Sequence, residues 1–210
     1  AVPLSYSSTP AELAAIAEEA PLALLYTESR YAEQVREAVG PVRVELVDAG
    51  PADVPVPHPA GARVGPCLPE TDPAAVALAQ YTSGTSARPK AVLHSQHTIM
   101  WNALSQLGDL AIDADAVTLV VPSLAWGAGL HDLTLATLWA GGEVVVYPSR
   151  GLDPERLVAR LAAERVSHVF LSPSVMRRIL AAGVRAPGPL DALRVVLTGG
   201  EPIADHLIRE

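Results

Sequence analysis

The chain has 210 residues, half of them hydrophobic, and a formal net charge of -8 at pH 7. This length accommodates one large domain or part of something bigger, and the apolar content is sufficient for a substantial core. The acidic balance and the lack of a basic cluster argue against a nucleic-acid-binding surface and against a polybasic membrane anchor.

The chain contains one cysteine, Cys67, so it cannot form an intramolecular disulfide, which fits a reducing cytoplasm. Cys67 stands in a proline-rich segment with no histidine beside it, which disfavours a catalytic role for its thiol. No window reaches the roughly 18 apolar residues that a membrane-spanning helix needs, and the N-terminus lacks the basic flank and apolar run of a signal peptide. We therefore expect a cytoplasmic protein without a membrane span.

The N-terminal part of the sequence alternates between helix and strand patterns. Thr9 and Glu12 have the spacing of a capping box, and Pro10 stands at the first helical position. The periodicity of apolar residues predicts a β-α-β alternation behind a first helix. The expected elements are a helix over 11–20, a strand over 22–27, a helix over 29–40 and a strand over 42–48.

The segment 49–74 changes character, because it is rich in proline and glycine and shows no period. It is interpreted as a long irregular connection. A buried strand over 75–83 and a short strand over 91–95 follow it. Ser95 can then cap an amphipathic helix, whose apolar face would contain Ile99, Met100, Ala103, Leu104 and Leu107.

From residue 116 onward strands and helices alternate regularly, and Asp153-Pro154 has the sequence of a helix start. Continuous apolar strands alternating with helices of about ten or more residues predict an α/β fold, with mostly parallel sheets and helices on both faces. The expected strands are 116–124, 143–148, 167–173 and 193–200, and the expected helices are 130–142, 154–166, 174–183 and one from 201 onward.

A loop rich in hydroxyl groups follows the strand over 75–83 and leads to Lys90, the single lysine of the chain. A glycine with serine and threonine neighbours exposes backbone N–H groups and hydroxyls that can cradle a polyphosphate, and a lysine supplies a compact positive charge. The Gly-Lys-Ser/Thr ending of the P-loop and the kinase signatures are absent. The loop indicates either a nucleotide site of another class or a polar surface turn with an incidental lysine.

Residues 81–95, YTSGTSARPKAVLHS, resemble the phosphate-loop signature Tyr-Thr-Ser-Gly-Thr-Thr-Gly-x-Pro-Lys-Gly-Val of the AMP-forming adenylate-forming superfamily. That superfamily contains acyl-CoA synthetases, nonribosomal-peptide adenylation domains and luciferases. Ser86 replaces a threonine of the signature, and Ala87 and Ala91 replace glycines. The residues that match are Tyr81, Thr82, Ser83, Gly84, Thr85, Pro89, Lys90 and Val92.

The resemblance extends over nearly the whole chain. Residues 121–130, VPSLAWGAGL, are similar to the family's Pro-x-Phe-His-x-x-Gly-Leu region, with Trp126 in place of the common histidine. This implies that Trp126, Ala128 and Gly129 help to form an acyl pocket, in which Trp126 shortens the pocket or stacks on an aromatic acid. The alternative for Trp126 is ordinary core packing.

A second segment of the resemblance is VVLTGGEPI over 195–203, which is similar to the family's Gly-Gly-(Ala/Glu)-Pro-Leu segment. It implies that Gly199, Gly200, Glu201 and Pro202 border the adenine of ATP. Within the family, the sequence PKAVLHSQHT over 89–98 resembles the medium-chain and aryl acyl-CoA ligases most.

The reaction that the resemblance implies uses ATP, Mg²⁺ and coenzyme A. A carboxylic acid attacks the α-phosphate of Mg-ATP to give an acyl-adenylate and pyrophosphate, and coenzyme A then takes the acyl group as a thioester. The resemblance assigns Lys90 the catalytic role of stabilising the pyrophosphate leaving group. The residues expected to hold the β- and γ-phosphates are Thr82, Ser83, Gly84, Thr85, Ser86 and Lys90.

The family's Tyr-Gly-x-Thr-Glu motif, whose glutamate binds magnesium, has no counterpart here, nor does the catalytic lysine of its C-terminal domain. We therefore expect residues 1–210 to be a partial AMP-binding N-terminal domain without that C-terminal domain, inactive by itself. The cut edges of a parallel sheet further predict that such a fragment self-associates.

Two alternatives to an acyl-CoA ligase stay open. A nonribosomal-peptide adenylation domain would carry a substrate-binding aspartate in a Phe-Asp-x-Ser-like stretch, and SLAWGAGL over 123–130 has none. A non-catalytic nucleotide-binding module is favoured by the missing catalytic parts. A hydrolase triad around His131-Asp132 is disfavoured, because neighbouring helical residues face different ways and no Gly-x-Ser-x-Gly elbow exists. His94 and His97 lack an H-E-x-x-H pattern for zinc, and His168 is expected in the core.

Overall fold

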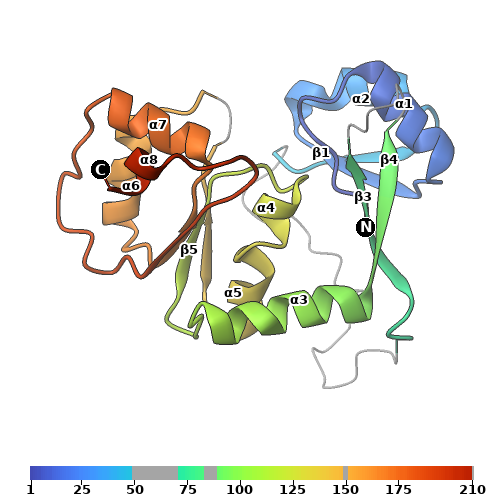
Figure 1. Ribbon diagram of the computed structural model, residues 1–210. Coiled ribbons are helices and arrows are strands. Elements are labelled where there is room, and N and C mark those ends of the chain that lie inside the picture. Colours follow the sequence, from blue (N-terminus) through green and yellow to red (C-terminus); the bar gives the residue numbers. More distant parts are fainter. Residues whose placement is uncertain (49–70, 83–88, 149–150, 210) are drawn as a thin grey trace. The chain divides into compact units, whose positions relative to one another are not determined.

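The computed structural model in Figure 1 describes residues 1–48, 71–82, 89–148 and 151–209. Most of the irregular connection expected over 49–74 lies outside the described residues. The chain divides into two compact units, Ala1–Leu93 and His94–Glu210, and each is described by itself. Within the described ranges, no helix is both long enough and apolar enough to cross a membrane.

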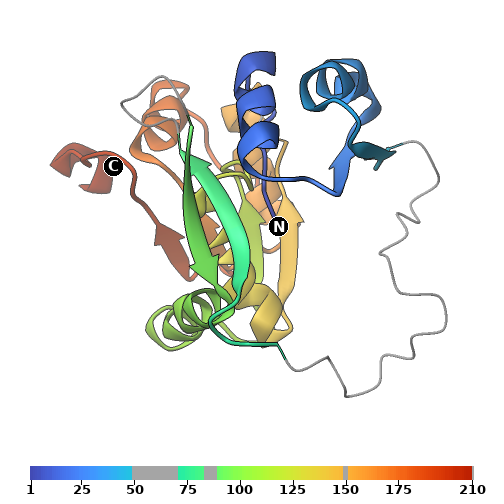
Figure 2. The same cartoon turned by 90° about the vertical axis from the view of Figure 1, so that its right-hand side faces the viewer.

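The first unit combines two small sheets with helices. Parallel strands β1 and β2 pair from Leu24 opposite Arg43 to Thr27 opposite Leu46, and β3 lies beside β4 (Figure 2). The capping box at Thr9 is confirmed, because Thr9 Oγ1 accepts from the Glu12 backbone N–H and the Glu12 carboxylate accepts from the Thr9 N–H. In chain order the elements are α1 (Pro10–Glu19), β1 (Leu24–Thr27), η1 (Ser29–Tyr31), α2 (Ala32–Val39), β2 (Arg43–Leu46), β3 (Val76–Thr82) and β4 (Lys90–Ser95).

The second unit is built on a four-stranded, wholly parallel sheet in the order β6-β5-β7-β8. Two of its helices begin where the sequence predicts caps, because the side chains of Ser95 and Asp153 accept backbone N–H groups of the following turn. Ser172, expected within a strand, caps a further helix in the same way. The elements are α3 (Gln96–Asp109), β5 (Val117–Val120), α4 (Gly127–Leu130), α5 (Thr134–Ala140), β6 (Glu143–Val146), α6 (Pro154–Ala163), β7 (His168–Phe170), α7 (Pro173–Ala181), β8 (Val195–Leu197) and α8 (Asp205–Arg209).

Helices cover both faces of this sheet, as the sequence predicts (Figure 1). Alternate strand residues point to opposite faces, so Leu119 and Val169 pack against α6 and α7. Phe170 packs on the other side with residues of α3 and α5, and the Thr118 hydroxyl lies 2.6 Å from the Thr137 hydroxyl of α5. The predicted α/β class with parallel sheets and helices on both faces is confirmed.

Two helix predictions are wrong. The single helix expected over 130–142 is broken between α4 and α5, where Leu133 has a φ of 70°. Gln106 holds this break: its amide NH₂ donates to the His131 carbonyl, and its amide oxygen accepts from the Leu133 N–H. These bonds replace the helical ones that the break removes. The last helix begins at Asp205 rather than at 201, because Glu201 is bonded to α7 instead.

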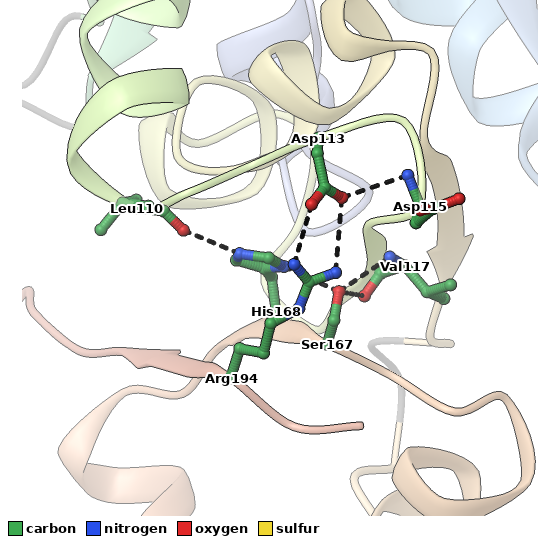
Figure 3. Close-up of polar contacts among 7 residues, drawn as sticks. All are labelled: Leu110, Asp113, Asp115, Val117, Ser167, His168 and Arg194. Atoms are coloured by element: carbon green, nitrogen blue, oxygen red, sulfur yellow. Dashed lines mark hydrogen bonds and ion pairs between the residues drawn. The ribbon is translucent and has the colours of Figure 1, made fainter. Parts of the chain in front are cut away.

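His168 lies in a polar cluster at the end of the sheet where β5 and β7 begin (Figure 3). Its side chain is fully buried. Since the Leu110 carbonyl can only accept, His168 Nε2 donates to it at 3.0 Å and Nδ1 accepts from the Ser167 hydroxyl at 2.7 Å. The same hydroxyl accepts from the Val117 N–H at 2.9 Å. The prediction that His168 is satisfied in the core is confirmed.

An ion pair lies next to this cluster at the surface. The Arg194 guanidinium donates to the Asp113 carboxylate at 3.0 and 3.4 Å, which lowers the pKa of that carboxyl below its ordinary value. Asp113 also accepts from the Asp115 N–H (Figure 3).

Ser167 and His168 are in contact, but the second ring nitrogen of His168 is bonded to a main-chain carbonyl rather than to an acid. Ser167 and His168 therefore lack the acid that orients the histidine in a hydrolase triad.

Candidate substrate pocket

A pocket of about 760 Å³ opens in the second unit at the carboxyl ends of the parallel strands. We call it the strand-end pocket. The segments that follow each of the four strands contribute residues to its wall. Open α/β sheets bind their ligands at this edge, beyond the carboxyl ends of the strands. Its lining residues are mostly apolar, with a few polar groups among them: Val121, Pro122, Trp126, Ala128, Asp132, Leu152, Phe170, Ser172, Val175, Arg178, Leu197, Thr198, Gly199 and Gly200.

Trp126 and Ala128, which the sequence assigns to an acyl pocket, both line the strand-end pocket. Trp126 keeps about half of its surface exposed, 51%, so its role is not ordinary core packing. It directly precedes α4 as the N-cap residue. Its indole therefore offers an apolar wall on which a planar ligand could stack.

Gly129, the third residue assigned to the acyl pocket, does not line it. It is buried in α4, where an added Cβ would lie 2.2 Å from the Ser123 carbonyl oxygen. Only glycine permits this approach of α4 to the segment after β5. Gly129 shapes the pocket through the backbone rather than through a contact with its interior.

The Gly199–Pro202 segment is divided by the structure. Gly199 and Gly200 line the strand-end pocket, whereas Glu201 and Pro202 do not. The Glu201 carboxylate accepts from the Ser174 N–H at 2.7 Å and pairs with Arg177 at 2.9 Å, and the bond from Arg177 lowers the pKa of that carboxyl. Glu201 therefore ties the loop after β8 to the first turn of α7, which positions the two glycines at the pocket.

Asp132 is a pocket residue that the sequence analysis did not assign. Its side chain is half-buried and lines the strand-end pocket. Burial raises the pKa of its carboxyl, and His131 is the titratable group that opposes this shift. Among the described residues, no hydrogen-bond donor or cation contacts the carboxylate.

His131 faces a different environment from its neighbour, as the sequence analysis expects. It is 8% exposed, and its ring lies 4.8 Å from that of His94. Burial, together with the nearby His94, lowers the pKa of His131. Its Nε2 has no hydrogen-bond partner in the described part of the chain. His131 is therefore buried against His94 and does not form a catalytic pair with Asp132.

The expected phosphate-binding loop belongs to the first unit. Thr82 is the last residue of β3 and Lys90 the first of β4, and the two strands are paired neighbours. Ser83, Gly84, Thr85 and Ser86 lie outside the described residues. Both Thr82 and Lys90 are exposed, so their side chains are available to a ligand.

The described residues contain no group of three or more His, Cys, Asp or Glu side chains arranged to hold a metal ion.

Solved structures share this fold over nearly the whole chain. VinN superposes on the chain with a TM-score of 0.80 at 26% identity, and the match covers 99% of the chain and 50% of the VinN chain. ATP-bound MatB from Rhodopseudomonas palustris superposes with a TM-score of 0.77 at 20% identity over 99% of the chain and 41% of its own. The chain thus has the α/β fold of these two proteins.

The chain belongs to the AMP-binding enzyme family, because the model of that family matches residues 1–210. The resemblance inferred from the sequence is therefore confirmed. The chain is 28% identical to indoleacetate–CoA ligase of Aromatoleum aromaticum over all of its length and 42% of that protein's. It is 31% identical to feruloyl-CoA synthase of an Amycolatopsis species over 98% of the chain and 40% of the relative.

A nonribosomal peptide synthetase is also similar. CymA of Salinispora arenicola, a probable non-canonical synthetase, is 32% identical over 85% of the chain and 2% of its own length. The chain spans about 40% of the length of indoleacetate–CoA ligase and feruloyl-CoA synthase. It is similar both to these proteins and to a nonribosomal peptide synthetase, so the similarity alone does not identify the acyl acceptor.

Proposed function

We propose that the protein takes part in the ATP-dependent activation of a carboxylic acid and its transfer to coenzyme A. In the first step a carboxylate oxygen of the acid attacks the α-phosphorus of ATP. The bond from this phosphorus to the β-phosphate oxygen breaks, and pyrophosphate leaves with its electron pair. In the second step the coenzyme A sulfur attacks the acyl carbon, AMP leaves, and the thiol proton is released.

The observation that carries this proposal is the composition of the strand-end pocket. It brings together Trp126 and Ala128 from the segment after β5 with Gly199 and Gly200 from the segment after β8. The family resemblance gives the first segment to the acyl group and the second to the nucleotide. One cavity lined by both segments supports a reaction that joins an acid to an adenylate.

The phosphate-binding role falls to the first unit in this proposal. Lys90 would compensate the charge that develops on pyrophosphate as the bond to the α-phosphate breaks, which is electrostatic stabilisation of the leaving group. Thr82 and the loop residues after it would bind phosphate oxygens. Mg²⁺ would arrive with ATP and supply further charge neutralisation.

The substrate that the pocket suits is an acid with a planar, apolar body. The pocket is lined mainly by hydrophobic side chains, and the half-exposed indole of Trp126 forms part of its wall. The names of the two CoA-dependent relatives, which specify indoleacetate and ferulate, agree with an aromatic acid. We therefore propose an aryl-substituted carboxylic acid as the substrate class.

A second candidate is the adenylation of an amino acid, with a carrier-bound thiol as the acceptor. The observation that favours it is the carboxylate of Asp132 in the strand-end pocket, since a carboxylate there could pair with an ammonium group. The similarity to CymA also agrees with it.

The test is acid-dependent exchange of labelled pyrophosphate into ATP by the protein at its full natural length. A panel of arylacetic acids, cinnamic acids and amino acids should produce exchange with at least one aryl acid, followed by thioester formation when coenzyme A is added. Exchange with amino acids alone would favour the second candidate. No exchange with any acid of the panel would contradict the proposed reaction.

A further inference from the structure

Asp132 lines the strand-end pocket, and no side chain or backbone group in the described ranges of the second unit bonds its carboxylate. It shares the strand-end pocket with hydrophobic side chains and with Arg178, yet Arg178 makes no ion pair with it and instead donates from Nη2 to the Leu152 carbonyl at 2.6 Å. A partly buried carboxylate without donors is costly to desolvate. Such a group is retained more readily where a ligand supplies the missing donor.

Hydrogen bonds hold the backbone around Asp132 in place. Both of its neighbours are fixed by Gln106, which bonds the His131 carbonyl at 3.0 Å and the Leu133 N–H at 2.7 Å. The Asp132 N–H donates to the Gly127 carbonyl. Leu133 is fully buried and keeps a left-handed φ of 70°, a conformation that costs a leucine about 1 kcal/mol or more. The fold thus maintains a break that places a carboxylate at the pocket.

We propose that Asp132 determines specificity by accepting a hydrogen bond from a donor group, a hydroxyl, N–H or ammonium, on the body of the acid substrate. This inference rests on the proposed function, because it assumes that the acid enters the strand-end pocket. The substrate's own carboxylate would be repelled by Asp132, so the donor lies on another part of the molecule. Acids whose body is wholly apolar leave the Asp132 carboxylate desolvated and unpaired.

The first arm of the test measures binding directly, by ligand-observed NMR titration of the full-length protein. The probes are phenylacetic acid and its 3- and 4-hydroxy, 3- and 4-aminomethyl, and 3- and 4-methoxy derivatives. The wild type should bind the best donor-bearing acid about tenfold more tightly than its methoxy counterpart, which is the range of one hydrogen bond to a charged group.

The second arm replaces the carboxylate. Asp132→Leu should abolish the preference for donors and bind the unsubstituted and methoxy acids at least as well as the wild type, a gain that a merely structural role would not produce. Asp132→Asn keeps an acceptor oxygen, so it should retain part of the preference for a neutral hydroxyl but lose that for an ammonium group. Asp109→Asn, at an exposed residue of α3, removes the same charge and should change nothing.

Equal affinity of the wild type for donor and methoxy acids would overturn the proposal, and so would a preference that survives in Asp132→Leu. Thermal denaturation of each variant identifies any that fail to fold. Pyrophosphate exchange with the same acids separates this inference from the proposed function. Exchange without donor preference removes only the role of Asp132, whereas no exchange with any acid removes both.

Discussion

The second unit contains two groups of inward-facing polar side chains, and they differ in whether the protein satisfies them. In the cluster around His168, both ring nitrogens are bonded, and the Ser167 hydroxyl connects the ring to the Val117 backbone. In the strand-end pocket at the opposite ends of the strands, the Asp132 carboxylate has no donor among the described residues, and it shares the pocket with the half-exposed indole of Trp126.

The difference separates a structural polar group from a functional one. Buried polar groups that are fully hydrogen-bonded rigidify a fold, and removing one leaves its partners unsatisfied. A polar group without partners in a cavity does not stabilise the folded state and leaves its bonding capacity for a ligand. Substitutions in the two regions should therefore affect different measurements.

The largest effect on stability is expected from His168→Leu. It leaves the Leu110 carbonyl without its donor and removes one of the bonds of the Ser167 hydroxyl in a fully buried site, so the free energy of unfolding should fall by about 2–4 kcal/mol. Chemical denaturation measures this loss, and the affinity for the acid should stay unchanged. His97→Leu is the matched control, because His97 is exposed on α3. A loss as small as that of the control would show that the cluster is not structural.

A smaller effect on stability, coupled to the pocket, is expected from Gly129→Ala. The new Cβ would lie 2.2 Å from the Ser123 carbonyl oxygen, so α4 must move away from the segment after β5. Such overpacking costs about 1–3 kcal/mol, and the movement should weaken acid binding through Trp126 and Ala128.

Gly127→Ala is the control for this substitution within the same helix, since an added Cβ there meets nothing within 4 Å. Alanine favours the helical conformation, so this variant should be as stable as the wild type or slightly more stable. Equal behaviour of the two variants in denaturation and in acid titration would contradict the account of Gly129.

The sequence predicted those features that depend on local chemistry. The caps at Thr9, Ser95 and Asp153 were predictable because a side-chain oxygen next to a helix start bonds the adjacent N–H groups. The parallel sheet followed from apolar strands that alternate with helices, and the core position of His168 followed from its place within a strand.

Features that depend on contacts distant in sequence were not predictable. The break between α4 and α5 is stabilised by Gln106, a residue 25 to 27 positions earlier in the chain. In the sequence prediction, which lacks this break, Asp132 lies within a continuous helix and has no assigned role. The last helix begins at Asp205 rather than at Glu201 because Glu201 bonds α7. No local sequence pattern predicts that contact.

The central claim, that the chain binds ATP for acid activation through its single lysine, is tested most directly by calorimetric titration of the full-length protein with Mg-ATP. Lys90→Ala should weaken binding about tenfold or more, as expected for loss of a charged contact to phosphate. Arg36→Ala, which removes an exposed cation from α2 of the same unit, should bind as the wild type does. Equal affinity of the Lys90 variant and the wild type, or no binding by either, would contradict the account.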